Sequence, residues 1–269
     1  LEDCKSVVSP GTKDEGNTQE DKDEPLDMEQ SSQYRALAAR CNYLVTDRPD
    51  VAYAVKELAR DMSSPKRGSW YRLKRLARYF AGKPRMVLWF VWQGQQGQLH
   101  VFSDSDWAGC RETRRSTSGG CVMHGAHVLK MWSKTQTLIA LSSGEAELYA
   151  LVKATAEGMC IRSLYRDLGM NMETQIWGDA SAALGIINRK GLGKVRHLDT
   201  NLLWVQDVAA NRNIQYGKVL GSDNPADMFT KYLDEATSRK HCEFLRCYYE
   251  DGRADSAPKL NMVWNIIHA

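Results

Sequence analysis

The chain has 269 residues, 43% of them hydrophobic and 26% charged, a composition typical of a globular protein that holds one mid-sized domain and a smaller neighbour. Its formal net charge of +3 is too small to establish a polyanionic partner, so the distribution of charge is more informative than the total. The longest apolar run, Met86 to Trp92, is far shorter than the roughly 20 residues of a membrane-spanning helix, so no membrane partner is expected.

The first part of the chain divides into an acidic segment and a helical segment. Residues 1–30 are acidic and contain no aromatic side chain, so we expect a disordered linker there. Residues 31–85 carry three stretches of apolar residues at helical spacing, interrupted near Pro49 and Pro65 and ended near Pro84. This range is predicted to form a small helical segment.

The third of these helices has a basic side opposite its apolar side. It carries Arg72, Arg75 and Arg78, which are candidates for binding the phosphates of a nucleic acid. An ordinary solvated helix face explains the same pattern equally well.

From residue 86 onward, runs typical of strands alternate with helical periodicity. Residues 86–233 are predicted to form one α/β domain, in which a mixed sheet is flanked by helices, and residues 234–269 a C-terminal extension with a weaker signal. The expected strands are 86–92, 99–103, 119–124, 127–132, 174–178 and 214–220, and the expected helices are 143–168, 180–189, 198–211 and one from about 225.

Acidic residues fall where these elements begin or end. Asp104 follows the strand 99–103, Glu147 lies in the first turns of the long helix, Asp179 follows the strand 174–178, and Asp227 opens the last helix. Strand ends and neighbouring helix starts meet at one edge of such a sheet, so these carboxylates can converge. Taken singly, Asp179 is also a good helix N-cap and Asp227 a good first-turn partner of a helix dipole.

The long helix offers two glutamates, and local geometry separates their roles. Ser142 and Glu145 fit the capping pattern S-x-x-E, which predicts that Glu145 folds back on the helix start. Glu147 is two residues further, about 200° around the helix, so the two side chains cannot enter one site. Glu147 is therefore assigned to chemistry and Glu145 to structure.

Several sequence blocks resemble the ribonuclease H of copia-type retrotransposons. The similarity runs in order from about Gln33 to Leu233, including the segment that joins reverse transcriptase to this nuclease. The blocks are Ser103–Gly109 (SDSDWAG), Arg114–Gly119 (RRSTSG), Ala140–Glu147 (ALSSGEAE), Gly178–Ala182 (GDASA) and Pro225–Lys231 (PADMFTK).

The resemblance implies a ribonuclease H-like fold with a mixed five-stranded sheet, preceded by a helical connection segment at 31–85. It implies that Asp104, Glu147, Asp179 and Asp227 are the catalytic residues and hold two Mg²⁺ ions, for which Mn²⁺ can substitute, to cut the RNA strand of an RNA/DNA hybrid. Clustered carboxylates also call for hard divalent cations on grounds of charge alone. The implied partners are the hybrid and the upstream reverse transcriptase and integrase domains of a polyprotein.

Two alternatives remain open, a catalytically inactive transposon remnant and a nucleic-acid-binding connection module. Gly144 and Ala180 depart from the family pattern, which has threonine and asparagine there. Arg114 and Arg115 are further candidates for phosphate contacts, although a solvated loop is as good an interpretation. The seven cysteines are scattered and no signal peptide precedes them, which favours a reduced cytoplasmic or nuclear setting.

Overall fold

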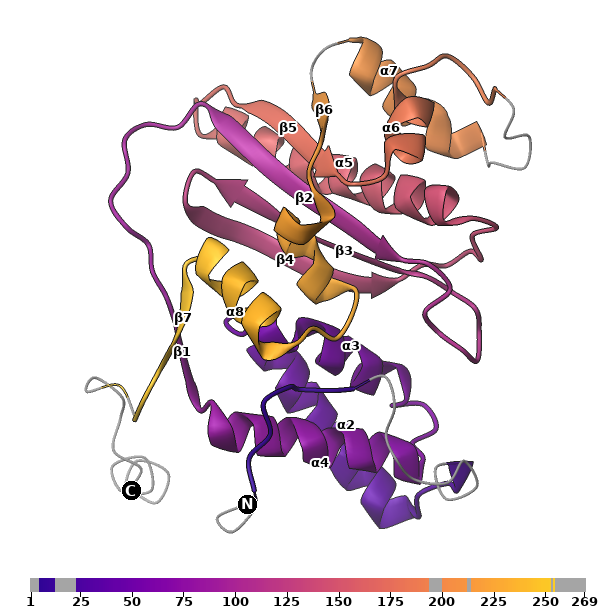
Figure 1. Cartoon of the computed structure of the whole chain (residues 1–269), viewed down its shortest axis with the longest axis vertical. Coiled ribbons are helices and arrows are strands. Elements are labelled where there is room, and N and C mark those ends of the chain that lie inside the picture. Colours follow the sequence, from indigo (N-terminus) through magenta and orange to yellow (C-terminus); the bar gives the residue numbers. More distant parts are fainter. Residues whose placement is uncertain (1–4, 13–22, 194–199, 212–213, 253, 255–269) are drawn as a thin grey trace.

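A computed structural model describes the chain except for residues 1–4, 13–22, 194–199, 212–213, 253 and 255–269. Its centre is a mixed five-stranded sheet in the order β4-β3-β2-β5-β6, as Figure 1 shows. The first three strands pair antiparallel, whereas β5 pairs parallel to β2 and β6 parallel to β5. The strands are β2 (Gln98–Asp106), β3 (Thr117–His124), β4 (His127–Thr135), β5 (Glu173–Gly178) and β6 (Gln215–Lys218).

Helices cover both faces of this sheet, and the alternation of side chains along β2 explains why. Val101 joins a core with Leu148 and Leu151 of the long helix α5 (Ser143–Asp167), while the next residue, Phe102, joins a second core on the opposite face. The expected α/β class, with a mixed five-stranded sheet flanked by helices, is therefore confirmed. The first face carries α5 (Ser143–Asp167), α6 (Ser181–Ile187) and α7 (Trp204–Ala210), the last preceded by the 3₁₀ helix η2 (Thr200–Leu203).

The second face is covered by short elements from both ends of the chain. Ala52 of helix α3 (Ala52–Arg60) shares a core with Ala226 and Phe229, and α3 also contacts β4. The elements there are the 3₁₀ helices η3 (Gly221–Asp223) and η4 (Pro225–Phe229), followed by α8 (Glu235–Phe244). Where a helix from about 225 was predicted, the structure has the short 3₁₀ helix η4, whose first residue is Pro225.

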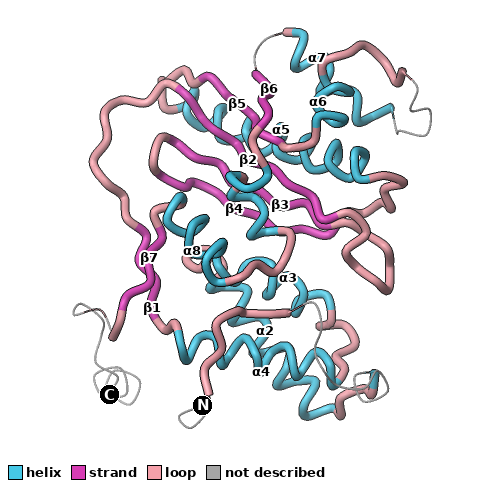
Figure 2. The backbone as a smooth tube through the Cα atoms, in the orientation of Figure 1, coloured by secondary structure: helices cyan, strands magenta, loops and turns pink. Residues whose placement is uncertain are grey.

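The predicted helical segment forms its own small core below the sheet (Figure 2). Tyr34, Leu58 and Leu76 are fully buried in it, and the Tyr34 hydroxyl donates to the carbonyl of Leu58 at 2.7 Å. The elements are α2 (Met28–Leu44), the 3₁₀ helix η1 (Pro49–Val51), α3 (Ala52–Arg60) and α4 (Arg67–Gly82). Helix α2 begins at Met28, inside the range expected to be disordered; residues 1–4 and 13–22 of that range lie outside the described residues.

The expectation for 86–92 was wrong. Only β1 (Arg85–Leu88) is a strand, and it pairs with β7 (Cys247–Glu250) in a separate two-stranded sheet rather than with the main sheet. The described part of the C-terminal extension, including α8 and β7, is likewise regular structure, with Cys242 and Leu245 buried in the second core. This part of the chain is ordered by contacts with β1 and with Ala52, which are distant in the sequence. Local periodicity does not reveal such contacts.

A buried polar network ties this C-terminal strand to the helical segment. Arg48 donates to both carboxylate oxygens of Asp50 at 2.9 and 2.8 Å, and the Tyr79 hydroxyl donates to Asp50 at 2.8 Å. The Tyr249 hydroxyl of β7 lies 2.9 Å from that of Tyr79. The helical segment and the strand β7 are therefore joined through the carboxylate of Asp50.

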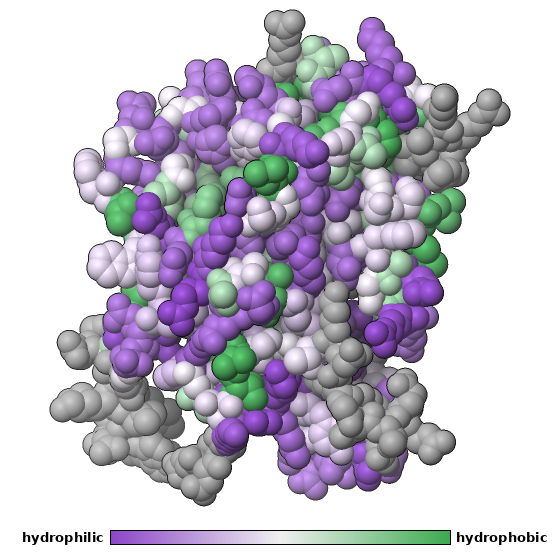
Figure 3. All heavy atoms as spheres, viewed as in Figure 1, coloured by the Kyte–Doolittle hydropathy of each residue, from purple (hydrophilic) through white to green (hydrophobic). Residues whose placement is uncertain are grey.

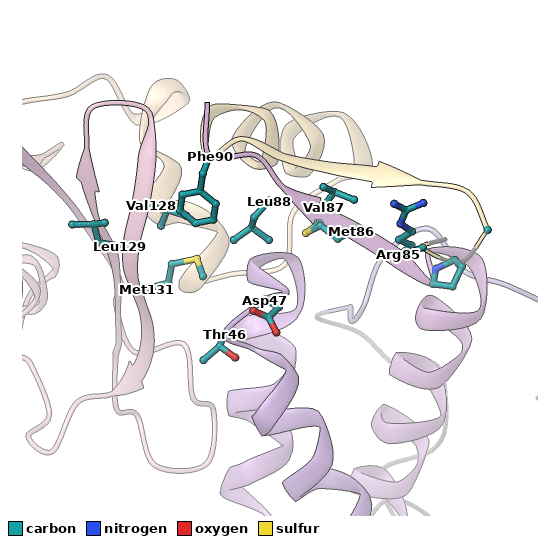
Figure 4. A pocket seen from close by; sticks show the side chains of 13 residues that line it. Thr46, Asp47, Arg85, Met86, Val87, Leu88, Phe90, Val128, Leu129 and Met131 are labelled. Atoms are coloured by element: carbon teal, nitrogen blue, oxygen red, sulfur yellow. The ribbon is translucent and has the colours of Figure 1, made fainter. Parts of the chain in front are cut away.

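The face seen in Figure 3 is mostly hydrophilic, with hydrophobic residues in small groups. A cavity of about 980 Å³ lies between β1 and β4, where Leu88 and Phe90 approach Val128 and Met131 (Figure 4). It contains none of the four candidate acids. No described helix combines the length and the hydropathy needed to cross a bilayer.

Candidate metal centre

Asp104 lies inside strand β2 rather than after it, because β2 continues to Asp106. The residue is 3% exposed, and its register partner on β3 is Gly119. The Thr230 hydroxyl, just after η4, donates a hydrogen bond to the Asp104 carboxylate. The carboxylate therefore lies where the sheet meets the η4 turn.

The start of α5 places its two glutamates as the capping pattern predicted. The Ser142 hydroxyl accepts from the backbone N–H of Glu145 at 3.2 Å, and Glu145 accepts from the N–H of Leu141 at 2.8 Å. Glu145 thus caps one residue further back than the usual box. Glu147 turns to the sheet, where its Oε1 accepts from the N–H of Ser105 at 3.1 Å.

Three of the four predicted acids meet at this edge of the sheet. Asp104, Glu147 and Asp179 each contribute a carboxylate oxygen, and these three oxygens lie within 4.8 Å of one another. Asp179 follows β5 directly, and the N-cap of α6 is the next residue, Ala180. Asp179 is therefore not the N-cap of α6, which was the alternative interpretation of this residue.

Asp227, the fourth acid, comes to the cluster on η4. Asn224 fixes this turn: its side chain donates to the carbonyl of Ser103 at 2.9 Å and accepts from the N–H of Ala226 at 3.2 Å. The charge of Asp227 acts on Asp104, and the ammonium of Lys231 binds Asp227 at 2.9 Å. All four acids thus belong to one neighbourhood.

The close approach of these carboxylates, together with their burial, raises their pKa values. Burial and the nearby Asp227 charge raise the pKa of Asp104 to about 6. Burial, together with the charges of Asp104 and Asp179, raises the pKa of Glu147 to about 9. The pKa of Asp179 is also raised, by burial and then by Asp104. Such a cluster favours uptake of positive charge, as protons or as cations.

The oxygen atoms left without partners fit a divalent cation. Glu147 Oε2 and Asp227 Oδ1 are buried and accept no hydrogen bond from the described residues. A buried carboxylate oxygen without a partner is costly, whereas Mg²⁺ and Mn²⁺ prefer oxygen ligands of this kind. The residues present therefore match the donor set of a hard metal ion.

Sequence reasoning missed three residues of this site: Asn224, Thr230 and Lys231. All three lie in or next to the block Pro225–Lys231, in which only Asp227 received a role. Their presence in the block was a usable signal, but their contacts to Ser103, Asp104 and Asp227 depend on the folding of η4 against β2.

The five candidate arginines do not gather at the acids. Arg72 pairs with Asp61 and lines a cavity of about 460 Å³ together with Arg114, whereas Arg78 donates to the carbonyl of Lys5 at 2.6 Å. Arg115 is exposed in the β2–β3 loop, and Arg75 is partly buried on α4. Their contact with nucleic acid stays a prediction.

No family model matches the chain. The retrovirus-related Pol polyprotein from transposon RE2 of Arabidopsis thaliana is 31% identical over 205 residues, which are 75% of this chain but only 14% of that relative. The secreted RxLR effector protein 161 of Plasmopara viticola is 40% identical over 124 residues, 46% of this chain and 87% of that protein. Among solved structures, LC11-RNase H1 isolated from compost covers 50% of this chain and 94% of its own, with 16% identity and a TM-score of 0.36.

Proposed function

The chain belongs to the retrovirus-related Pol polyproteins of copia-type transposons and carries their ribonuclease H domain, and from this premise we propose that it is a metal-dependent endonuclease that hydrolyses the RNA strand of RNA/DNA hybrids. The observation that carries the proposal is the meeting of Asp104, Glu147 and Asp179 within 4.8 Å, with Asp227 beside them. In the whole polyprotein, reverse transcriptase and integrase domains would be its partners.

In the proposed reaction, Asp104, Glu147, Asp179 and Asp227 hold two Mg²⁺ ions. When bound, such ions activate a water and stabilise the leaving oxygen of an in-line displacement at phosphorus. The protein contributes the geometry: β2 fixes Asp104, Ser105 N–H orients Glu147, and Asn224 holds the turn that carries Asp227. Because these contacts are buried or partly buried, the carboxylates are positioned before substrate arrives.

The proposal is tested by incubating the full chain with a labelled RNA/DNA hybrid and Mg²⁺. Asp104→Asn and Glu147→Gln keep the side-chain shape but remove a ligand charge, and each should lower the cleavage rate at least about 100-fold. The matched control is Asp223→Asn, an exposed acid of η3 that pairs with Lys240 and lies outside the cluster. It should cleave like the wild type.

The outcomes separate the alternatives. Tight hybrid binding without cleavage by the wild type would support a binding module, and absence of both would support an inactive remnant. Double-stranded DNA is included as a competing substrate, and its preferential cleavage would contradict the choice of RNA/DNA hybrid.

A further inference from the structure

A positive charge already lies among the four acids. Lys231 comes four residues after Asp227, just beyond the end of η4, and its ammonium Nζ is 2.9 Å from Asp227 Oδ2. The same charge acts on Asp104 and on Asp179, so three of the four acids interact with this one cation. Thr230, the neighbouring residue, is held by Asp104, which fixes the backbone from which the lysine extends.

This ion pair uses a carboxylate that the proposed metal centre needs. Oδ2 of Asp227 forms the ion pair with Lys231, whereas Oδ1 is buried and has no hydrogen-bond partner among the described residues. The ammonium therefore neutralises the charge of the carboxylate but leaves one of its oxygens available to a metal ion. Two cations close to one carboxylate oxygen repel each other, and the repulsion is strong where water is partly excluded. The Lys231 side chain is 35% exposed and has a flexible four-carbon stem, so it has room to move away.

We propose that Lys231 is the resident counter-ion of the acid cluster, and that a divalent ion binds Asp227 by displacing its ammonium. The inference rests on the proposed metal centre and adds a residue that sets its affinity. In the metal-free protein the lysine stabilises the carboxylates of Asp104, Asp179 and Asp227, and during metal binding it competes for that of Asp227. Metal affinity is therefore weaker than the four acids alone would provide.

The test is a calorimetric titration of MnCl₂ into the full chain without nucleic acid, together with the melting temperature of the metal-free protein. Lys231→Gln should bind Mn²⁺ about fivefold more tightly, since the loss of a partly exposed ion pair is of that size. It should also melt at a lower temperature without metal. Lys231→Arg keeps the charge and should restore both values toward the wild type.

Lys240→Gln is the matched control, because Lys240 forms a comparable ion pair with Asp223 on the surface, and it should leave Mn²⁺ affinity unchanged. If the wild type binds Mn²⁺ and Asp104→Asn abolishes binding, but Lys231→Gln binds equally or more weakly, the counter-ion inference alone is overturned. If the wild type binds no Mn²⁺, the metal centre and the inference fail together.

Discussion

Asp104 on β2 lies opposite Gly119 on β3, and the η4 turn packs directly over that glycine. A Cβ atom at Gly119 would come 2.7 Å from both the Phe229 Cβ and the Thr230 Cγ2, and 2.9 Å from the Phe229 carbonyl carbon. Gly119→Ala should therefore push η4 away from the sheet and move Asp227 from Asp104. We expect a loss of about 1–3 kcal/mol in unfolding free energy and about 100-fold in hybrid cleavage, measured by urea titration and by the cleavage assay.

Gly185→Ala is the control for this substitution. Gly185 lies in α6, and a Cβ there meets no atom within 4 Å, so alanine should leave cleavage intact and stabilise the helix by up to about 1 kcal/mol. Wild-type cleavage by Gly119→Ala would contradict the role given to close packing of η4 on β3.

The pH dependence of stability follows from Glu147. Its pKa rises from an ordinary 4.5 to about 9 in the folded, metal-free protein. The folded state thus keeps a proton that the unfolded chain releases, so this stabilisation is complete below pH 4.5 and is lost as the pH rises toward about 9. Asp104 contributes in the same direction over a lower range, up to about pH 6.

Divalent metal should reverse this trend, because a metal ion binds the ionised carboxylates. In EDTA, the melting temperature should fall between about pH 5.5 and about pH 8.5, whereas the gain on adding MgCl₂ should be larger at the higher pH. Scanning calorimetry at the two pH values measures both effects. An equal Mg²⁺ gain at both values would argue against metal binding by this cluster.

Glu147→Gln should stabilise the metal-free protein at about pH 8. The amide keeps the oxygen that accepts from Ser105 and is neutral without binding a proton, whereas Glu147, whose pKa is about 9 in the folded protein, must take up a proton on folding at pH 8. We expect the melting temperature in EDTA to rise by about 5 °C, and the variant to lose most of the Mg²⁺ effect. Glu145→Gln is the comparison, since Glu145 caps the helix and should give no such gain. A destabilised Glu147→Gln in EDTA would contradict the electrostatic account.

The site was predictable where it depends on local sequence. The division of roles between Glu145 and Glu147 needed only a capping pattern and the helical period, and the structure places both side chains accordingly. Asp179 directly follows β5, as expected from the end of the predicted strand, whereas Asp104 lies inside β2, which continues to Asp106 instead of ending at residue 103. Their catalytic roles stay predictions.

Contacts between distant segments were not predictable in this way. The strand β7 pairs with β1, and Lys231 binds Asp227 within a turn whose position is fixed by Asn224 and Ser103. A short apolar run can indicate a strand, but it does not indicate which other strand it will pair with, because any extended segment can provide the backbone hydrogen bonds. A lysine after a motif likewise gives no indication of which carboxylate it will reach.

A substitution of Asp50 tests the contact between the helical segment and the strand β7. It is buried, accepts two hydrogen bonds from Arg48 and one from Tyr79, and lies 3.4 Å from the Tyr249 hydroxyl of β7. Asp50→Asn leaves the 7% exposed Arg48 without its counter-charge, so we expect a loss of about 3–5 kcal/mol in unfolding free energy, measured by urea titration. Asp223→Asn breaks an exposed pair with Lys240 and should cost less than about 1 kcal/mol. Because Tyr249 shares the network, Asp50→Asn should also speed hydrogen exchange in β7, and unchanged exchange in β7 would contradict the link between this strand and the helical segment.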